Sequence, residues 1–133
     1  MQRELESLAA ASAKTGTLLC DRGTLDGLAY WPGSWDDYFE DLGTTFDIEL
    51  ARYAMVIHLR VPDANSGYTN DAVRGESARE AGEIDARLED VWAAHPHRVF
   101  VESSLDFVRK AQRALALIRG ELICCASKGP RAA

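Results

Sequence analysis

Three short apolar runs, separated by segments with helical spacing, most constrain what this chain can fold into. The runs cover residues 17–21, 55–61 and 98–102, and no hairpin turn joins one to the next. Between and around them, apolar residues recur at three- and four-residue intervals over 2–13, 76–94 and 105–122. Strands that alternate with helices predict a parallel sheet with right-handed crossovers. We therefore predict the α/β class.

Shorter helices are expected between the first and second apolar runs. They cover residues 25–31, 35–42 and 46–53. Ser34 and Thr45 precede two of them, and their hydroxyls are well suited to accept hydrogen bonds from the first helical turn. Gly43 is expected to end the helix of residues 35–42.

Charge and composition narrow the function classes. The chain has 133 residues, 47% of them hydrophobic, which is enough for one domain with one core. Its net charge of −6 argues against a broad basic face for nucleic acid or for a membrane surface. No apolar run approaches the ~20 residues of a membrane span, and no signal-peptide core is present. We expect a cytoplasmic protein whose three cysteines are buried or tail thiols with no zinc-like spacing.

An acid, a base and a glycine end the first apolar run. If residues 17–21 are a strand, Asp21-Arg22-Gly23 lies at the carboxyl edge of the sheet, where open α/β folds bind ligands. An acid there suits Mg²⁺, an arginine suits anionic substrates, and Asp26 can face the same crevice. A turn in which the acid only caps the next helix explains the same residues. The spacing leaves both interpretations open.

A polar loop over residues 62–73 leads into the long helix and forms a second candidate cluster. Tyr68, Asn70, Arg74 and Arg79 belong to it. A mobile arginine-bearing segment can close over phosphates during phosphoryl transfer. A solvent-facing helix start, with Arg79 paired to Glu83, is the alternative.

The histidines and aromatic side chains are expected to be structural. His58 lies within the second apolar run and is interpreted as a satisfied core residue. Trp31, Trp35, Tyr38 and Phe39 cluster in one segment and are expected to pack in the core. The motifs G-x-S-x-G, H-E-x-x-H and G-x-G-x-x-G are absent from these residues.

Taken in order, several segments resemble a known family. The chain is similar, over residues 2–122, to AAA-type ATP-binding P-loop NTPases related to the ribosylnicotinamide kinase domain. The resemblance rests on the following residues: Gln2-Arg3-Glu4-Leu5-Glu6, Cys20-Asp21-Arg22-Gly23-Thr24-Leu25-Asp26-Gly27, Tyr30-Trp31, Val56-Ile57-His58-Leu59, Tyr68, Arg74-Gly75-Glu76-Ser77-Ala78, Glu80-Ala81, Ile84-Asp85, Trp92, His95-Pro96, Asp106-Phe107 and Lys110.

The resemblance implies a three-layer α/β/α, P-loop kinase-like parallel sheet that binds ATP or GTP with Mg²⁺ and acts on an unknown acceptor. It implies that Asp21 is the Walker-B-like acid and metal ligand, and that Arg22 and Arg74 are catalytic. Asp26, Tyr68 and Arg79 are then the substrate-binding residues. The domain would cover residues 1–123, with 124–133 as a frayed tail.

The chain departs from the family at the phosphate-binding loop. No G-x-x-x-x-G-K-[ST] occurs, and Lys14-Thr15-Gly16 has a different order. Ala54 stands where the family often has an acid. We expect an N-terminally truncated fold with impaired nucleotide binding, whose open sheet edges favour homo-oligomers. The alternative is a non-catalytic binding or protein-interaction domain that has lost the loop.

Overall fold

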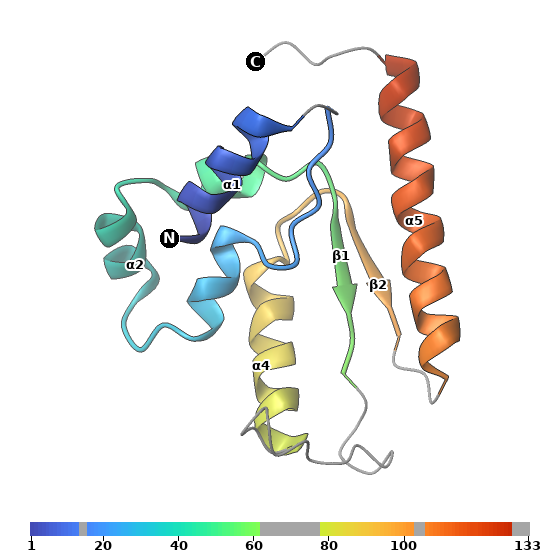
Figure 1. The fold of residues 1–133 in the computed structure, drawn as a ribbon. Coiled ribbons are helices and arrows are strands. Elements are labelled where there is room, and N and C mark those ends of the chain that lie inside the picture. The colour runs from blue at the N-terminus through green and yellow to red at the C-terminus, as the bar shows by residue number, and fades with distance from the viewer. Residues whose placement is uncertain (14–15, 62–77, 103–105, 129–133) are drawn as a thin grey trace.

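The computed structural model describes residues 1–13, 16–61, 78–102 and 106–128, with the side chains of 78–79 and 123–128 excepted. Helices dominate this part of the chain, and two short strands form its sheet (Figure 1). The elements are α1 (Gln2–Ser12), the 3₁₀ helix η1 (Thr24–Ala29), α2 (Trp35–Leu42), α3 (Phe46–Ala51), β1 (Val56–Leu59), α4 (Ala78–Val91), β2 (Arg98–Val101) and α5 (Phe107–Lys128).

The two strands run parallel and confirm the mixed α/β prediction. Val56 pairs with Arg98 and Leu59 with Val101, so the strands are in register over their full length. A parallel pair needs a crossover connection, and α4 lies within it. Helices α4 and α5 lie on opposite sides of the strands (Figure 1). The carboxyl ends of both strands therefore meet at one edge.

The strand predicted over residues 17–21 is wrong. Residues 17–20 have no regular secondary structure, and the sheet of the described residues holds β1 and β2 alone. Leu18 is 40% exposed and Leu19 67% exposed, so this run is not buried between layers. An apolar run becomes a strand only where a neighbouring strand takes its backbone hydrogen bonds, and among the described residues neither β1 nor β2 pairs with residues 17–20.

The predicted helix caps are confirmed. The Ser34 hydroxyl accepts from the Asp37 amide at 3.2 Å, and the Asp37 carboxylate accepts from the Ser34 amide at 3.0 Å. This reciprocal pair is a capping box. Gly43 ends α2 with φ 63°, a left-handed conformation that glycine adopts without strain. Thr45 caps α3 by accepting from the Ile48 amide.

The core lies where α4 crosses η1 and the α2–α3 segment. Leu25 is fully buried, and Trp92 packs at the end of α4. Its buried members are Leu25, Leu28, Tyr38, Phe39, Val91 and Trp92. The aromatic segment therefore enters the core, as expected, although Trp35 is 43% exposed at its rim. The core is built mainly from helices.

Two predicted apolar helix faces are not buried. Leu5 and Leu8 on α1 are exposed, and the buried residue of that helix is Glu6. On α5, Phe107 and Val108 are 79% and 60% exposed, and Leu115 and Leu122 are exposed as well. The spacing of apolar residues predicts which face of a helix is apolar, but it does not predict whether another element covers that face. Helix α5 continues to Lys128, into the stretch predicted as a tail.

Several predicted features lie outside the described residues. They are the loop of residues 62–73 with Tyr68, Asn70 and Arg74, and the side chain of Arg79.

None of the described helices has the length and apolar composition that a membrane-spanning segment needs.

Candidate functional site

The Asp21-Arg22-Gly23 turn lies between the irregular segment of residues 17–20 and the start of η1. The side chains of Asp21 and Arg22 are both exposed. The backbone of the turn is fixed from α1, because the Gln2 side-chain amide donates to the Arg22 carbonyl at 2.7 Å. Gly23 caps η1, and its amide donates to the Asp26 carboxylate at 3.1 Å. Asp21 and Arg22 thus project from a turn that is held on both sides.

Asp26 points toward the core. One of its carboxylate oxygens accepts from the Gly23 amide, and the other accepts from the Trp92 indole at 2.6 Å. A Cβ on Gly23 would come within 2.8 Å of the Trp92 ring, so the close approach requires glycine here. Both oxygens of Asp26 therefore hold the turn against α4. Asp21, Arg22 and Asp26 are close in sequence, but Asp26 faces away from the exposed pair.

Thr24, the first residue of η1, is the meeting point of three side chains. Its amide donates to the Tyr53 hydroxyl at 2.6 Å, and its carbonyl accepts from the Tyr38 hydroxyl at the same distance. Its own hydroxyl accepts from Arg52 at 3.3 Å. Thr24 is 3% exposed, so these bonds satisfy the polar groups of a buried residue.

Two buried carboxylates meet at Arg52 beneath the turn. Glu49 is fully buried and Glu6 is 7% exposed. The Arg52 guanidinium contacts Glu49 at 2.6 Å and Glu6 at 2.9 Å. Arg3 approaches Glu49 at 3.2 Å, which brings a second positive charge to the pair of carboxylates. We call Glu6, Glu49, Arg52 and Tyr53 the buried network.

The Tyr53 phenol completes the network. It donates toward the Glu6 carboxylate at 3.0 Å and 3.1 Å while it accepts from Thr24. Burial raises the pKa of Tyr53 to about 12. A buried phenol beside a carboxylate stays protonated because a phenolate there would be desolvated and repelled.

Alkaline pH is therefore expected to weaken the fold through Tyr53. The folded pKa lies above the ordinary value of 10.0, so the unfolded chain releases the phenolic proton first. The stability that this group contributes is complete below pH 10 and is lost as the pH rises toward about 12. Urea unfolding at closely spaced pH values should show this slope. In Tyr53→Phe the slope should become shallower, and an unchanged slope would contradict the assignment.

Cys20 adjoins this network but is not buried, which corrects the prediction. Desolvation and the nearby Glu6 carboxylate raise the pKa of its thiol. A thiol is nucleophilic as the thiolate, so this environment makes Cys20 a poor nucleophile.

A second polar cluster links the sheet to α4. His58 is 7% exposed, and its Nε2 lies 2.8 Å from Asp85, which confirms its interpretation as a satisfied core residue. Arg60, just past β1, contacts Asp85 at 3.3 Å and Glu89 at 2.5 Å. Lys110 of α5 donates to the Arg60 carbonyl. These bonds fasten α4 and α5 to the carboxyl end of β1.

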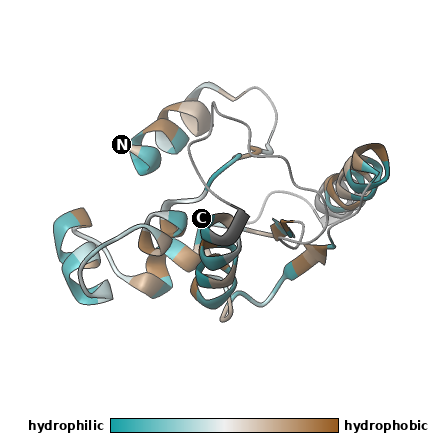
Figure 2. Cartoon of the chain, turned by 90° about the horizontal axis from the view of Figure 1, so that it is seen from below, coloured by the Kyte–Doolittle hydropathy of each residue, from teal (hydrophilic) through white to brown (hydrophobic). Residues whose placement is uncertain are grey.

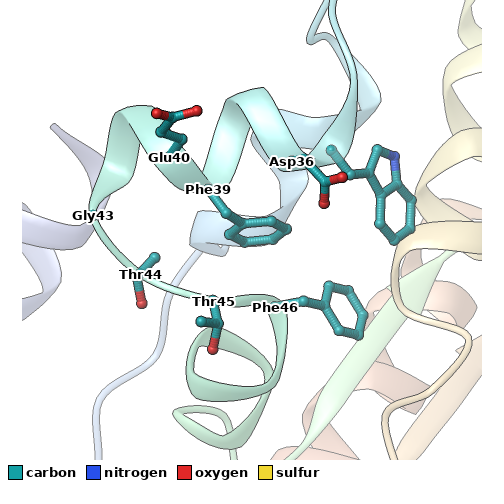
Figure 3. Close-up of a pocket in the computed structure, with 8 residues that line it drawn as sticks. Asp36, Phe39, Glu40, Gly43, Thr44, Thr45 and Phe46 are labelled. Carbon is teal, nitrogen blue, oxygen red and sulfur yellow. The ribbon is translucent and has the colours of Figure 1, made fainter.

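A hollow of about 470 Å³ opens on another face, between α2 and α3. Phe39 and Phe46 lie beside it, with the carboxylate of Asp36 nearby (Figure 3). The Trp35 ring stacks on Phe46 with 5.5 Å between centroids. Glu40 also lines it, so the hollow combines aromatic walls with an acidic rim.

Sequence reasoning singled out Asp21-Arg22-Gly23 but left a strand end and a turn both open, and it missed the network beneath these residues. Glu6, Glu49 and Tyr53 carry no local signal of burial, since they come from α1, α3 and the segment after α3. The only local indication was the three-residue spacing of Glu49 and Arg52, which permits an ion pair on one helix face.

Comparison with known proteins gives one family. A family model described as an AAA domain matches residues 1–110. Neither the curated proteins nor the solved structures contain a match to this chain.

Proposed function

Since this chain belongs to the AAA domain family of P-loop NTPases, we propose that its Asp21-Arg22-Gly23 turn is one half of a phosphoryl-transfer or NTP-hydrolysis site. The family match covers most of the chain and indicates P-loop NTPase-like nucleotide binding. A kinase- or ATPase-like chemistry, on a three-layer P-loop kinase-like fold, is the finer proposal. The acceptor is an unnamed anionic or hydroxyl-bearing molecule.

One observation carries the proposal. Asp21 and Arg22 are exposed on a turn whose backbone and neighbours are fixed by side-chain hydrogen bonds from Gln2, Tyr53 and Trp92. A simple surface turn needs no such support. Catalytic groups do, because they act best when the surrounding structure holds them in place before the ligand arrives.

The residues fit a nucleotide-bound Mg²⁺. This ion usually keeps several waters and takes one or two protein carboxylates together with phosphate oxygens. The exposed Asp21 carboxylate supplies such a ligand. Bound Mg²⁺ would neutralise phosphate charge.

The remaining roles follow from charge. We propose that the Arg22 guanidinium binds the anionic substrate in a planar two-point contact. Arg74 would close over the phosphates together with Tyr68, which also precedes α4, and with Arg79 at the start of α4. Asp26 would contribute to substrate binding only by keeping the turn in position, because both of its carboxylate oxygens already accept hydrogen bonds.

Nucleotide binding by these 133 residues should be weak. The sequence has no glycine-rich loop with its lysine, so the cradle of backbone amides that gives P-loop proteins most of their phosphate contacts is missing from it. We expect a dissociation constant for Mg²⁺–ATP and Mg²⁺–GTP weaker than about 1 mM. Isothermal titration calorimetry measures it directly.

The control for this titration separates the turn from general electrostatics. Asp21→Ala should remove whatever Mg²⁺-dependent binding remains, while Asp90→Ala, an exposed acid on α4, should leave it unchanged. Micromolar affinity in the unaltered chain would refute the expected weakness. Equal effects of the two substitutions would refute the role of Asp21.

A protein-interaction domain is the second candidate function. Exposed large apolar side chains on α1 and α5 favour it, because patches of this kind mark interaction surfaces. Under this alternative Asp21→Ala leaves the biological role intact. A phosphotransferase activity that depends on Asp21 would exclude it.

A further inference from the structure

Helix α5 carries an apolar stripe that no described element covers. Val108, Leu115 and Leu122 are 60%, 49% and 40% exposed and follow one another at seven-residue intervals. Residues seven apart lie on the same side of a helix. Leu117, on the opposite side of the helix, is half-buried. The stripe is thus a continuous outward face.

The charge on this face is positive. Arg109, Arg113 and Arg119 are exposed on α5. Glu121 is the one acid between residues 107 and 122, and it lies 3.8 Å from His97. Arg119 falls between Leu115 and Leu122 on the stripe, at helical spacings of four and three residues. The outward face of α5 is therefore apolar with a basic border.

The hollow between α2 and α3 has the complementary character. Trp35, which lines the hollow, is 43% exposed, and Ile48 of α3 is 54% exposed. Residues 34–51 contain no lysine or arginine. The exposed acids of this segment are Asp36, Asp37, Glu40, Asp41 and Asp47, and Asp36 and Glu40 among them line the hollow. An apolar helix with basic flanks has the shape and charge that this acidic aromatic hollow can receive.

The two surfaces cannot meet within one chain. Helix α2 and helix α5 lie on opposite sides of the molecule, with α4 and the strands between them (Figures 1 and 2). A contact between these surfaces requires two molecules.

We propose that the basic apolar face of α5 docks into the acidic aromatic hollow of α2–α3 on a second copy of this chain. The contact is heterologous, because two different surfaces of the same protein meet. Each copy keeps one free α5 and one free hollow, so association continues beyond the dimer into a ring or an open chain. The proposal is independent of the Asp21 site.

Self-pairing of two α5 helices fits the charges less well. It would bring the arginines of one helix against those of the other, and like charges across an interface lower affinity. Docking on the acidic hollow pairs each arginine with a carboxylate instead. The apolar stripe fits self-pairing and docking on the hollow equally well, but the charges favour docking on the hollow.

The test uses two charge-reversal variants of the full chain. The α5 variant is Arg113→Glu with Arg119→Glu, and the hollow variant is Asp36→Lys with Glu40→Lys. Neither set touches the core or the buried network, and circular dichroism checks that both fold. Sedimentation equilibrium from about 10 μM to 1 mM should show association of the unaltered chain that weakens about tenfold between ~50 mM and ~500 mM salt. Each variant alone should associate about tenfold less tightly.

Mixing the two variants decides the geometry. The mixture holds one native pair of surfaces, the α5 of the hollow variant and the hollow of the α5 variant, and one pair in which both charges are reversed. We expect the mixture to recover association, with the two variants alternating. The chain carrying all four substitutions should recover salt-sensitive association. Asp90→Lys, an exposed reversal on α4, is the control and should associate like the unaltered chain.

Three results would overturn the proposal. A monomer at every concentration would exclude association. Loss of association in the α5 variant with no loss in the hollow variant would show that α5 pairs with itself. Association that neither variant weakens would place the contact elsewhere, for instance at the strand edges.

Discussion

Replacing Arg52 with methionine is expected to lower the free energy of unfolding by about 3 kcal/mol. The guanidinium is the shared partner of two carboxylates that are almost completely removed from water, Glu49 at 0% and Glu6 at 7% exposure. Methionine preserves most of the side-chain volume but removes the charge. Glu49 then keeps its contact with Arg3, but both carboxylates lose the charge that they share. Urea unfolding measures the loss.

Two further variants test the cause. Arg109→Met removes an exposed arginine from α5 and should change stability by less than about 0.5 kcal/mol. Arg52→Met combined with Glu49→Gln should be more stable than Arg52→Met alone, since one of the unpaired charges is gone. If Arg52→Met costs less than about 1 kcal/mol, water reaches the carboxylates and the network does not hold the turn as described.

Trp92→Ala is expected to be the other severe substitution, at about 3–5 kcal/mol. Trp92 is 4% exposed and packs edge-on against Tyr53 with 5.1 Å between ring centroids. Its indole also donates to Asp26, so alanine leaves both a cavity and a carboxylate oxygen without its donor. Because Gly23 lies against the same ring, the Asp21 turn should loosen at the same time.

Hydrogen exchange separates the local effect of this substitution from the global one. In Trp92→Ala the Gly23 amide should exchange faster than the overall loss of stability predicts, since its bond to Asp26 depends on the indole. Trp92→Phe should recover much of the packing but not the indole bond. Trp35→Ala, at a side chain 43% exposed, should cost less than about 1.5 kcal/mol. Equal losses at Trp35 and Trp92 would contradict the core described here.

Structural features could be predicted from the sequence where the interacting residues lie only a few positions apart in the chain. Ser34, Gly43 and Thr45 set the ends of α2 and α3 through bonds that span three or four residues, and all three were predicted correctly. His58 was recognised as a core residue from its apolar run, although its partner Asp85 was not. The sequence singled out Asp21 and its neighbours. The direction of the Asp26 side chain, however, depends on its hydrogen bond with Trp92, 66 residues away.

The failures share one physical cause. Residues 17–20 have the composition of a buried strand, and the outward face of α5 has the spacing of a buried helix, yet both are exposed. Removing apolar side chains from water lowers the free energy of the chain. They become buried, however, only where the fold brings a second surface against them. The reverse holds for Glu6 and Glu49. They are among the most polar residues, and they are buried because Arg52 compensates their charge.

The sequence by itself determined the α/β class, the helix boundaries set by caps and the family to which the residues point. These depend on interactions within a few residues and on the order of motifs. Only the tertiary structure decided that Glu6, Glu49, Arg52 and Tyr53 converge under the Asp21 turn and that Asp26 faces the core. It also placed α2, which lines the acidic hollow, and α5 on opposite sides of the molecule. The reason is that burial, charge compensation and the direction of a side chain depend on segments far apart in the chain, which local spacing does not encode.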